Sequence, residues 1–465
     1  MAEDGHDRGL VPNKCATMCL FGCLTTMGCR SSIVRRLAFY PPQPAGYSIG
    51  TEGQLYIYDG STSSQQGQQQ TAPPEDSINS ASGAAAAQPE DSPPQHLQRE
   101  SAQQLLQRTG LPERLKVLSI PCGRRVALAG LFIYHPLPPA SGLTGPGSET
   151  RPRTSRSGSE TRAAETDLPE GDAKAARRQT DGGSSRNGPS ARLAEAATSR
   201  EEQMMEESAK RLPCIIFSHG NSTDIGYMFG LYYRLAYRCR VNVLAYDYSG
   251  YGCSGGKATE KALYKNIRAV WSYATRVLQV PPRQIILYGH SVGSAPCCDL
   301  VMREKTYPVG GVVLHSSIAS GLRLFIEEID KAPWFDAFPN VEKLRKVKHT
   351  PIFIIHGQID RQVPWTHSQR LQTAALAADA DWLKEQERRR SKGKARGQKS
   401  SSEENEQTQL TAAAAEEMQA QRVQVWWVGN ADHNDVEQKS GELYYRRIGD
   451  FVNFCHTWAT THQTD

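Results

Sequence analysis

Short apolar runs alternate with longer amphipathic stretches along the second half of the chain. The apolar runs predict strands at 214–218, 241–246, 285–288, 312–315, 352–356 and 423–428. The stretches between them have helical length, at 227–238, 259–278, 291–303 and 366–377, and an amphipathic pattern predicts a last helix at 441–457. Continuous apolar strands that alternate with helices are typical of a parallel sheet covered on both faces. We therefore expect an α/β fold, with a mostly parallel central sheet flanked by helices and two further strands at 115–120 and 126–134.

Three polar, low-complexity stretches interrupt this pattern. They are rich in Ser, Gln, Gly, Ala and charged residues, and only 38% of the whole chain is hydrophobic, so we expect them to be disordered. The expected organisation is a cysteine-rich amino-terminal segment (1–58), a linker (59–104), one large α/β domain (105–458) and a short tail (459–465). Within the domain, the disordered inserts are expected at about 137–210 and 379–422.

Composition, net charge and cysteine content exclude some classes of protein. The chain has 54 Lys and Arg against 49 Asp and Glu, a net charge of +5, which gives no indication of nucleic-acid binding. No uncharged apolar run reaches the ~20 residues of a membrane-spanning helix. The eleven cysteines are odd in number and show no repeated spacing, which argues against a disulfide framework and favours a reducing, cytosolic compartment.

The sharpest chemical signal is the pentapeptide Gly-His-Ser-Val-Gly at 289–293. It follows the apolar run at 285–288 and opens a helical stretch, which is the context of a nucleophile elbow. The two glycines permit a tight strand-to-helix turn that would expose Ser291, and the helix amino terminus favours developing negative charge. We therefore predict that Ser291 is a nucleophile; the alternative is a glycine-rich turn with a capping serine.

A nucleophilic serine needs a base and an acid that orients the base. In α/β folds with a nucleophile elbow, the serine comes first along the chain, the aspartate or glutamate second and the histidine last. Asp360 and His433 each follow an expected strand, and 44 of the residues between them belong to the third insert. We therefore predict a Ser291–His433–Asp360 triad. Asp432, next to the histidine, is a weaker candidate for the acid. Asp247 is expected to brace a loop rather than to act as the acid.

Other reactive side chains have simpler interpretations. His219, His290, His315 and His356 are expected to be satisfied loop or core histidines, and Cys297 and Cys298 to be buried small hydrophobes. An oxyanion hole needs fixed N–H donors. We predict the backbone N–H groups of Val292 and Asn221, with Ser222 as an alternative to Asn221.

Longer phrases around these residues resemble a known family. From residue 217 onward they read FSHGNSTDIGYM, YDYSGYGCSGGKATEKALY, ILYGHSVGS, VVLHSSIASGLR, WFDAFPNVEKL, PIFIIHGQIDRQVPWTH and GNADHND. They are similar to the alpha/beta-hydrolase-domain-containing 17 family of serine hydrolases, which are protein depalmitoylases. The resemblance covers about 211–378 and 423–458, and more weakly 115–136. It implies an alpha/beta-hydrolase fold, and an S-palmitoylated cysteine cluster followed by a Leu-Ala-Phe-x-Pro-Pro segment, here residues 37–42.

The amino-terminal cysteines are consistent with a lipid anchor. Cys15, Cys19 and Cys23 recur at i+4 and would share one helical face, and Cys29 follows them. Several acyl chains, together with nearby arginines facing anionic lipid, would attach the chain firmly to a membrane surface. Signals for myristoylation or prenylation are lacking in the sequence given. A poor signal peptide or an ordinary polar tail would be the alternatives.

These observations predict a serine hydrolase that cleaves S-acyl thioesters on membrane-associated proteins. No cofactor or metal is implied, and the expected partners are S-acylated proteins and an anionic membrane surface, not nucleic acid. The expected location is the cytoplasmic face of the plasma membrane or an endomembrane, with peripheral, acyl-anchored attachment. A lipid esterase, a serine peptidase or a catalytically silent membrane scaffold are the alternatives.

Overall fold

The computed structural model describes residues 22, 29–58, 99–109, 112–137, 189–304, 308–395 and 421–461. The chain divides into two compact units, Met1–His135 with Met205–Asp465, and Pro136–Met204. Helix α4 (Pro189–Arg211) begins in the second unit and ends in the first. Apart from the first part of α4, everything described below belongs to the first unit.

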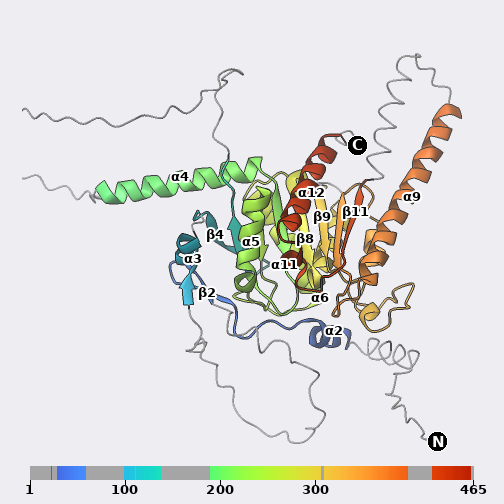
Figure 1. The fold of residues 1–465 in the computed structure, drawn as a ribbon, viewed down its shortest axis with the longest axis horizontal. Coiled ribbons are helices and arrows are strands. Elements are labelled where there is room, and N and C mark those ends of the chain that lie inside the picture. The colour runs from blue at the N-terminus through green and yellow to red at the C-terminus, as the bar shows by residue number, and fades with distance from the viewer. Residues whose placement is uncertain are drawn as a thin grey trace, which may run out of the picture. The chain divides into compact units, whose positions relative to one another are not determined.

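An eight-stranded sheet forms the centre of this unit (Figure 1). Its order is β11-β10-β9-β8-β6-β7-β5-β4, and the six strands from β11 to β7 are parallel, whereas β5 and β4 continue the sheet antiparallel. The strands are β4 (Leu115–Pro121), β5 (Ala127–Ile133), β6 (Cys214–Ser218), β7 (Asn242–Tyr246), β8 (Ile285–His290), β9 (Gly311–His315), β10 (Ile352–Gly357) and β11 (Val423–Val428). The carboxyl ends of β8, β10 and β11 therefore lie at one edge of the sheet.

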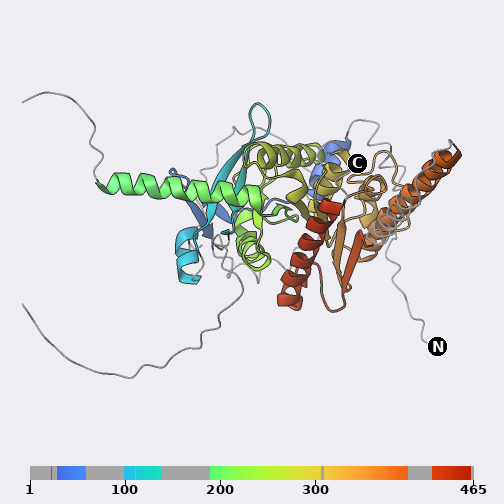
Figure 2. The same ribbon diagram turned by 90° about the horizontal axis from the view of Figure 1, so that it is seen from above.

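The inner strands are buried on both faces because alternate side chains enter two separate cores. Along β8, Ile285 and Leu287 pack into one core, and Ile286 and Tyr288 pack into the other. The first core is covered by α6 (Glu260–Arg276), α7 (Ser294–Arg303), α8 (Asn340–Leu344) and α9 (Thr366–Ala395). The second is covered by α5 (Ile225–Cys239), α11 (Val436–Ser440) and α12 (Glu442–Thr461), and Figures 1 and 2 show α5 and α12 together on that side.

Residues from the amino-terminal part of the chain pack onto this unit. They form α2 (Arg30–Ala38) and a three-stranded antiparallel sheet of β1 (Tyr47–Ile49), β2 (Leu55–Tyr58) and β3 (Arg99–Ser101), followed by α3 (Ala102–Thr109). Tyr47 joins the second core, and its hydroxyl donates to Asp247 Oδ2 at 2.5 Å. The segment after the cysteines is therefore part of the folded unit as well as a connection to it.

The predicted strands and most predicted helices are confirmed, and the differences lie in the polar inserts. Residues 189–211, within the stretch expected to be disordered, form α4, and the helix predicted at 366–377 continues as α9 to Ala395. The ends of the third insert are also buried, since Arg422 Nε donates to Asp379 Oδ1 at 2.6 Å. At these edges the structure differs from the expectation of disorder, because composition alone does not report helix propensity or one long-range ion pair; the rest of the inserts lies outside the described residues.

No helix among the described residues has both the length and the apolar character needed to cross a bilayer.

Candidate active site

Ser291 lies at a sharp turn directly after β8. Its φ angle is 54°, in the left-handed region that a residue with a side chain rarely adopts. Gly289 and Gly293 make this turn possible, because a Cβ at either position would collide with backbone atoms, those of residues 293 and 294 or the Ser218 carbonyl. A short 3-10 turn at 291–293 then leads into α7. The elbow predicted from the sequence is therefore present, with Ser291 held in a strained conformation.

Asp360 and His433 are joined by a hydrogen bond. Asp360 follows β10 and His433 follows β11, and His433 Nδ1 lies 2.7 Å from Asp360 Oδ2. The other carboxylate oxygen of Asp360 accepts the backbone N–H groups of Gln362 and Val363 at 2.9 and 2.8 Å. The carboxylate is thus fixed on both sides, so it holds the imidazole in one tautomer, with Nδ1 protonated and Nε2 free to accept a proton.

Asp360 is ionised although it is buried. Burial alone would raise its pKa, but hydrogen bonds from His356 and His433, and those from the backbone, outweigh burial and hold the pKa well below its usual range. His356 Nε2 lies 3.0 Å from Asp360 Oδ2, and its Nδ1 lies 2.6 Å from Ser368 Oγ. His356 was expected to be a satisfied core histidine; its contact with the same carboxylate oxygen as His433 was not expected.

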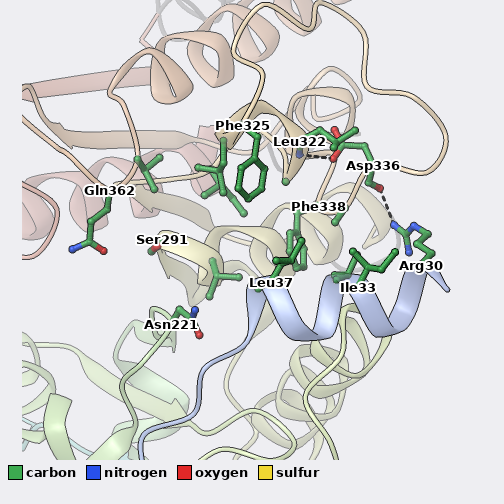
Figure 3. A pocket seen from close by; sticks show the side chains of 18 of the residues that line it. Arg30, Ile33, Leu37, Asn221, Ser291, Leu322, Phe325, Asp336, Phe338 and Gln362 are labelled. Carbon is green, nitrogen blue, oxygen red and sulfur yellow. Dashed lines mark hydrogen bonds between the residues drawn. The ribbon is translucent and has the colours of Figure 1, made fainter. Parts of the chain in front are cut away.

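Ser291 and His433 line the same cavity, which has a volume of about 260 Å³ (Figure 3). Val292 and Asn221, the predicted oxyanion-hole residues, also line it, as does Gln362. The Asn221 side chain is fixed, since its Oδ1 accepts the Tyr251 hydroxyl at 2.6 Å and the Tyr40 N–H at 2.9 Å. The structure thus brings all four predicted groups to one cavity; the pairing of particular N–H donors with a reacting carbonyl stays a prediction.

The two alternative acids have other partners. Asp432 pairs with Arg361 through two atoms of the arginine side chain, at 2.6 and 2.7 Å. Asp247 accepts the Ile225 N–H at the start of α5 and the Tyr47 hydroxyl, and it lies 3.3 Å from His219. Asp432 therefore holds a loop, and Asp247 braces the segment between β6 and α5.

Two more histidines, His290 and His315, lie close to His433. The His290 ring is 5.2 Å from that of His433 and 4.9 Å from that of His315, measured between ring centroids. Burial, together with the neighbouring His433, lowers the pKa of His290 to about 3, and burial also lowers the pKa of His315 far below its usual value. Both imidazoles are consequently neutral at physiological pH. They are core histidines as expected, but they are not fully satisfied, because His290 Nδ1 and His315 Nε2 have no hydrogen-bond partner among the described residues.

The cysteines separate into buried and exposed groups. Cys297 and Cys298 are fully buried on α7, and burial raises the pKa of both thiols, so neither is a nucleophile at neutral pH. Cys29 is exposed and directly precedes α2. Cys15, Cys19 and Cys23 lie outside the described residues, so their acylation stays a prediction.

Sequence reasoning missed the outer wall of the cavity. Ile33, Val34, Leu37 and Ala38 of α2 line one side, and the segment 318–338 lines the other. The i, i+1, i+4, i+5 spacing of the four apolar residues is a signal for an amphipathic helix. The helix was overlooked because it is short and its partner segment lies about 300 residues away along the chain.

The chain was compared with known proteins. Residues 215–448, which are 234 of the 465 residues, match the alpha/beta hydrolase family. Alpha/beta hydrolase domain-containing protein 17B of Homo sapiens is 41% identical over 157 residues, which are 34% of this chain and 53% of that protein. The 17C protein of Xenopus tropicalis is 44% identical over 153 residues, covering 33% of this chain and 48% of that protein. The match therefore spans about half the length of these curated relatives.

Among solved structures, an esterase from Pyrococcus furiosus is similar at 15% identity with a TM-score of 0.40, covering 73% of this chain and 90% of the esterase. The assignment of the fold depends on the family match and on the order and direction of the strands.

Proposed function

The chain belongs to the alpha/beta hydrolase family and is a hydrolase of that fold, and from this premise we propose that it acts as a serine hydrolase through Ser291, His433 and Asp360. The observation that carries the proposal is the 2.7 Å hydrogen bond between His433 and Asp360, at a cavity that Ser291 also lines. An acid, a base and a strained serine at the carboxyl ends of strands in one parallel sheet are the components that acyl transfer requires.

The reaction follows from the roles of these groups. Ser291 Oγ attacks the acyl carbonyl carbon while His433 Nε2 takes the hydroxyl proton, and the ionised Asp360 stabilises the resulting imidazolium. The N–H groups of Val292 and Asn221 would hold the negative oxygen of the tetrahedral intermediate. The intermediate collapses as His433 protonates the leaving group. Water, deprotonated by His433, then attacks the acyl-serine, and His433 returns the proton to Ser291 Oγ as the carboxylic acid leaves.

The proposed substrates are S-acyl thioesters on membrane-associated proteins. The resemblance of the sequence phrases to the depalmitoylases of the 17 family supports this choice, and so does an apolar cavity next to Ser291. A thiol is a good leaving group, so the reaction would need less assistance from His433 than cleavage of an amide would. Target proteins would be reached at the membrane surface.

The proposed location is the cytoplasmic face of a membrane, through acylation of Cys15, Cys19, Cys23 and Cys29. The exposure of Cys29 and of Arg35 and Arg36 on the outer side of α2 supports this proposal. A thiol must be accessible to be acylated, and arginines next to it would face anionic headgroups.

Labelling with a fluorophosphonate probe tests the triad. Ser291→Ala should abolish labelling, and Asp360→Asn and His433→Ala should lower thioester hydrolysis by on the order of 10⁴-fold, since the three residues act as a unit. Asp432→Asn is the matched control for Asp360→Asn, and it should keep activity within about tenfold of the wild type. If the folded wild type neither labels nor hydrolyses thioesters, the protein is a silent scaffold and the proposal is wrong.

A further inference from the structure

Helix α2 presents one face to the cavity and the other to solvent. Arg30, Ile33, Val34, Leu37 and Ala38 line the cavity, at positions i, i+3, i+4, i+7 and i+8 of the helix. Ser31, Ser32, Arg35 and Arg36 lie on the opposite face and are exposed. Phe39, directly after the helix, packs edge-to-face on Phe338 with 6.0 Å between the ring centroids. This contact joins the end of α2 to the opposite wall of the cavity.

That opposite wall is also apolar. It is formed by the segment between β9 and α8, and its lining side chains include Ile318, Leu322, Leu324, Phe325, Phe335 and Phe338. Figure 3 shows Ser291 and Gln362 toward one side of the cavity and Arg30 toward the other, with Leu37, Phe338 and Ile33 between them. The cavity is therefore an elongated apolar groove that leads away from Ser291 along α2.

Arg30 closes the end of the groove that is distant from Ser291. Its guanidinium donates to the carbonyl oxygens of Phe335 at 2.9 Å and Asp336 at 2.7 Å, and it pairs with Glu260 at 2.7 Å. These three partners are on two different segments, and they fix the first turn of α2 against the opposite wall. The groove thus has a defined length as well as an apolar lining.

We propose that this groove binds the acyl chain of the substrate, with the carbonyl at Ser291 and the methyl end toward Arg30, so that α2 determines which chain lengths are hydrolysed. This inference rests on the proposed function, because it assigns the acyl side of the same reaction. A peptide in the groove would leave backbone N–H and C=O groups without partners between apolar walls, which is costly. A saturated hydrocarbon chain has no such groups and gains from leaving water.

The proposal predicts a preference for longer acyl chains. Burial of each methylene contributes about 0.8 kcal/mol, which corresponds to about fourfold in kcat/KM for each methylene accommodated in the transition state. The gain should stop at the length at which the chain reaches Arg30. Side chains that narrow the groove or place charge in it should reduce the rate for long chains more than for short ones.

The experiment measures kcat/KM of the full-length protein on one cysteine peptide carrying S-acyl chains from acetyl to hexadecanoyl. Val34→Phe narrows the groove, and Leu37→Asp places a carboxylate in it at a half-exposed position. Each should lower the ratio of long-chain to short-chain kcat/KM at least tenfold. Ser32→Phe and Ser32→Asp make the same changes on the exposed face of α2 and should leave the ratio as in the wild type.

The outcomes separate the two proposals. If turnover of every chain length persists in Ser291→Ala, the proposed function is wrong. If turnover depends on Ser291 but the wild type shows no chain-length preference, or if both groove variants keep the wild-type ratio, then the acyl chain binds elsewhere and only the groove assignment is overturned.

Discussion

At the scale of single residues, Asp360 is the most constrained group in the site. One carboxylate oxygen lies within 3.0 Å of His433 and His356, and the other accepts two backbone N–H groups. Each contact favours the ionised carboxylate, which is why its pKa is low despite burial. The hydrogen bonds that fix the Asp360 loop thus also keep its carboxylate ionised, as its proposed role in orienting His433 requires.

His290 makes the stability of the fold dependent on pH. Its pKa is about 3 in the folded state and near 6.5 when unfolded, so the unfolded chain binds an additional proton between these values. The free energy of unfolding should therefore decrease as pH falls from about 6.5 toward 3, with a loss of about 2 kcal/mol from this residue by pH 5.

Denaturant unfolding at pH 7 and pH 5 checks this prediction. His290→Gln should reduce the loss of stability between the two pH values by about 2 kcal/mol, whereas His456→Gln, at an exposed position, should not change it. An unaltered pH dependence in His290→Gln would mean that another buried group causes the loss.

Sequence reasoning located residues that directly follow strands, and their catalytic roles stay predictions. Ser291, Asp360 and His433 could be selected because each follows an apolar run, and parallel strands bring such positions to one edge. The contact of His356 with Asp360 could not be predicted in this way. A histidine at the end of a strand gives the same pattern whether it faces the core or a carboxylate, and only the loop conformation decides between them.

At the scale of elements, α9 and the third insert show where composition misleads. Arg422, fully buried, donates to Asp379 Oδ1, the Thr350 carbonyl and the Ala375 carbonyl. The residues that begin and end the expected insert are thus part of the core, even though most of the sequence between them is charged and rich in Gln and Ala.

Two deletions test this distinction. Replacing 385–420 with a Gly/Ser joiner keeps Asp379 and Arg422 and should leave stability and thioester hydrolysis close to those of the full chain. Replacing 379–422 removes the pair and should lower stability markedly, because it also removes the two buried hydrogen bonds from Arg422 to the Thr350 and Ala375 carbonyls. Equal melting temperatures for the two deletions would show that the Asp379–Arg422 pair contributes nothing.

Helix α2 shows a second limit of sequence reasoning at this scale. Long apolar runs indicate buried strands directly, and so the ends of the strands could be predicted within one or two residues. The apolar face of α2 lies against residues that are far away along the chain, among them the segment 318–338, which Arg30 contacts across 305 positions. No local sequence pattern indicates that α2 contacts the segment 318–338.

At the scale of the whole molecule, the proposed anchor and the groove are contiguous in sequence, since Cys29 directly precedes Arg30. Replacing Cys15, Cys19, Cys23 and Cys29 together by Ser should move the protein from membranes to the cytosol. A single acyl chain binds membranes only marginally, with K of about 10⁴ M⁻¹, so any single replacement should have a smaller effect.

Fractionation of cells that express the four-Ser variant measures this directly, and hydrolysis of a soluble short-chain thioester provides the control for folding. Sedimentation of the variant with membranes at high salt would show that an apolar surface or a bound partner, rather than acylation, attaches the protein.

The central claim is that Ser291 hydrolyses acyl thioesters, and a panel of matched substrates tests it most directly. One hexadecanoyl chain is presented to the purified full-length protein as a thioester, an oxygen ester and an amide of otherwise identical peptides, and kcat/KM is measured for the wild type and Ser291→Ala. The account predicts the fastest turnover for the thioester, with all of it lost in Ser291→Ala. Turnover that survives in Ser291→Ala, or a wild type that cleaves the oxygen ester or the amide in preference to the thioester, would contradict it.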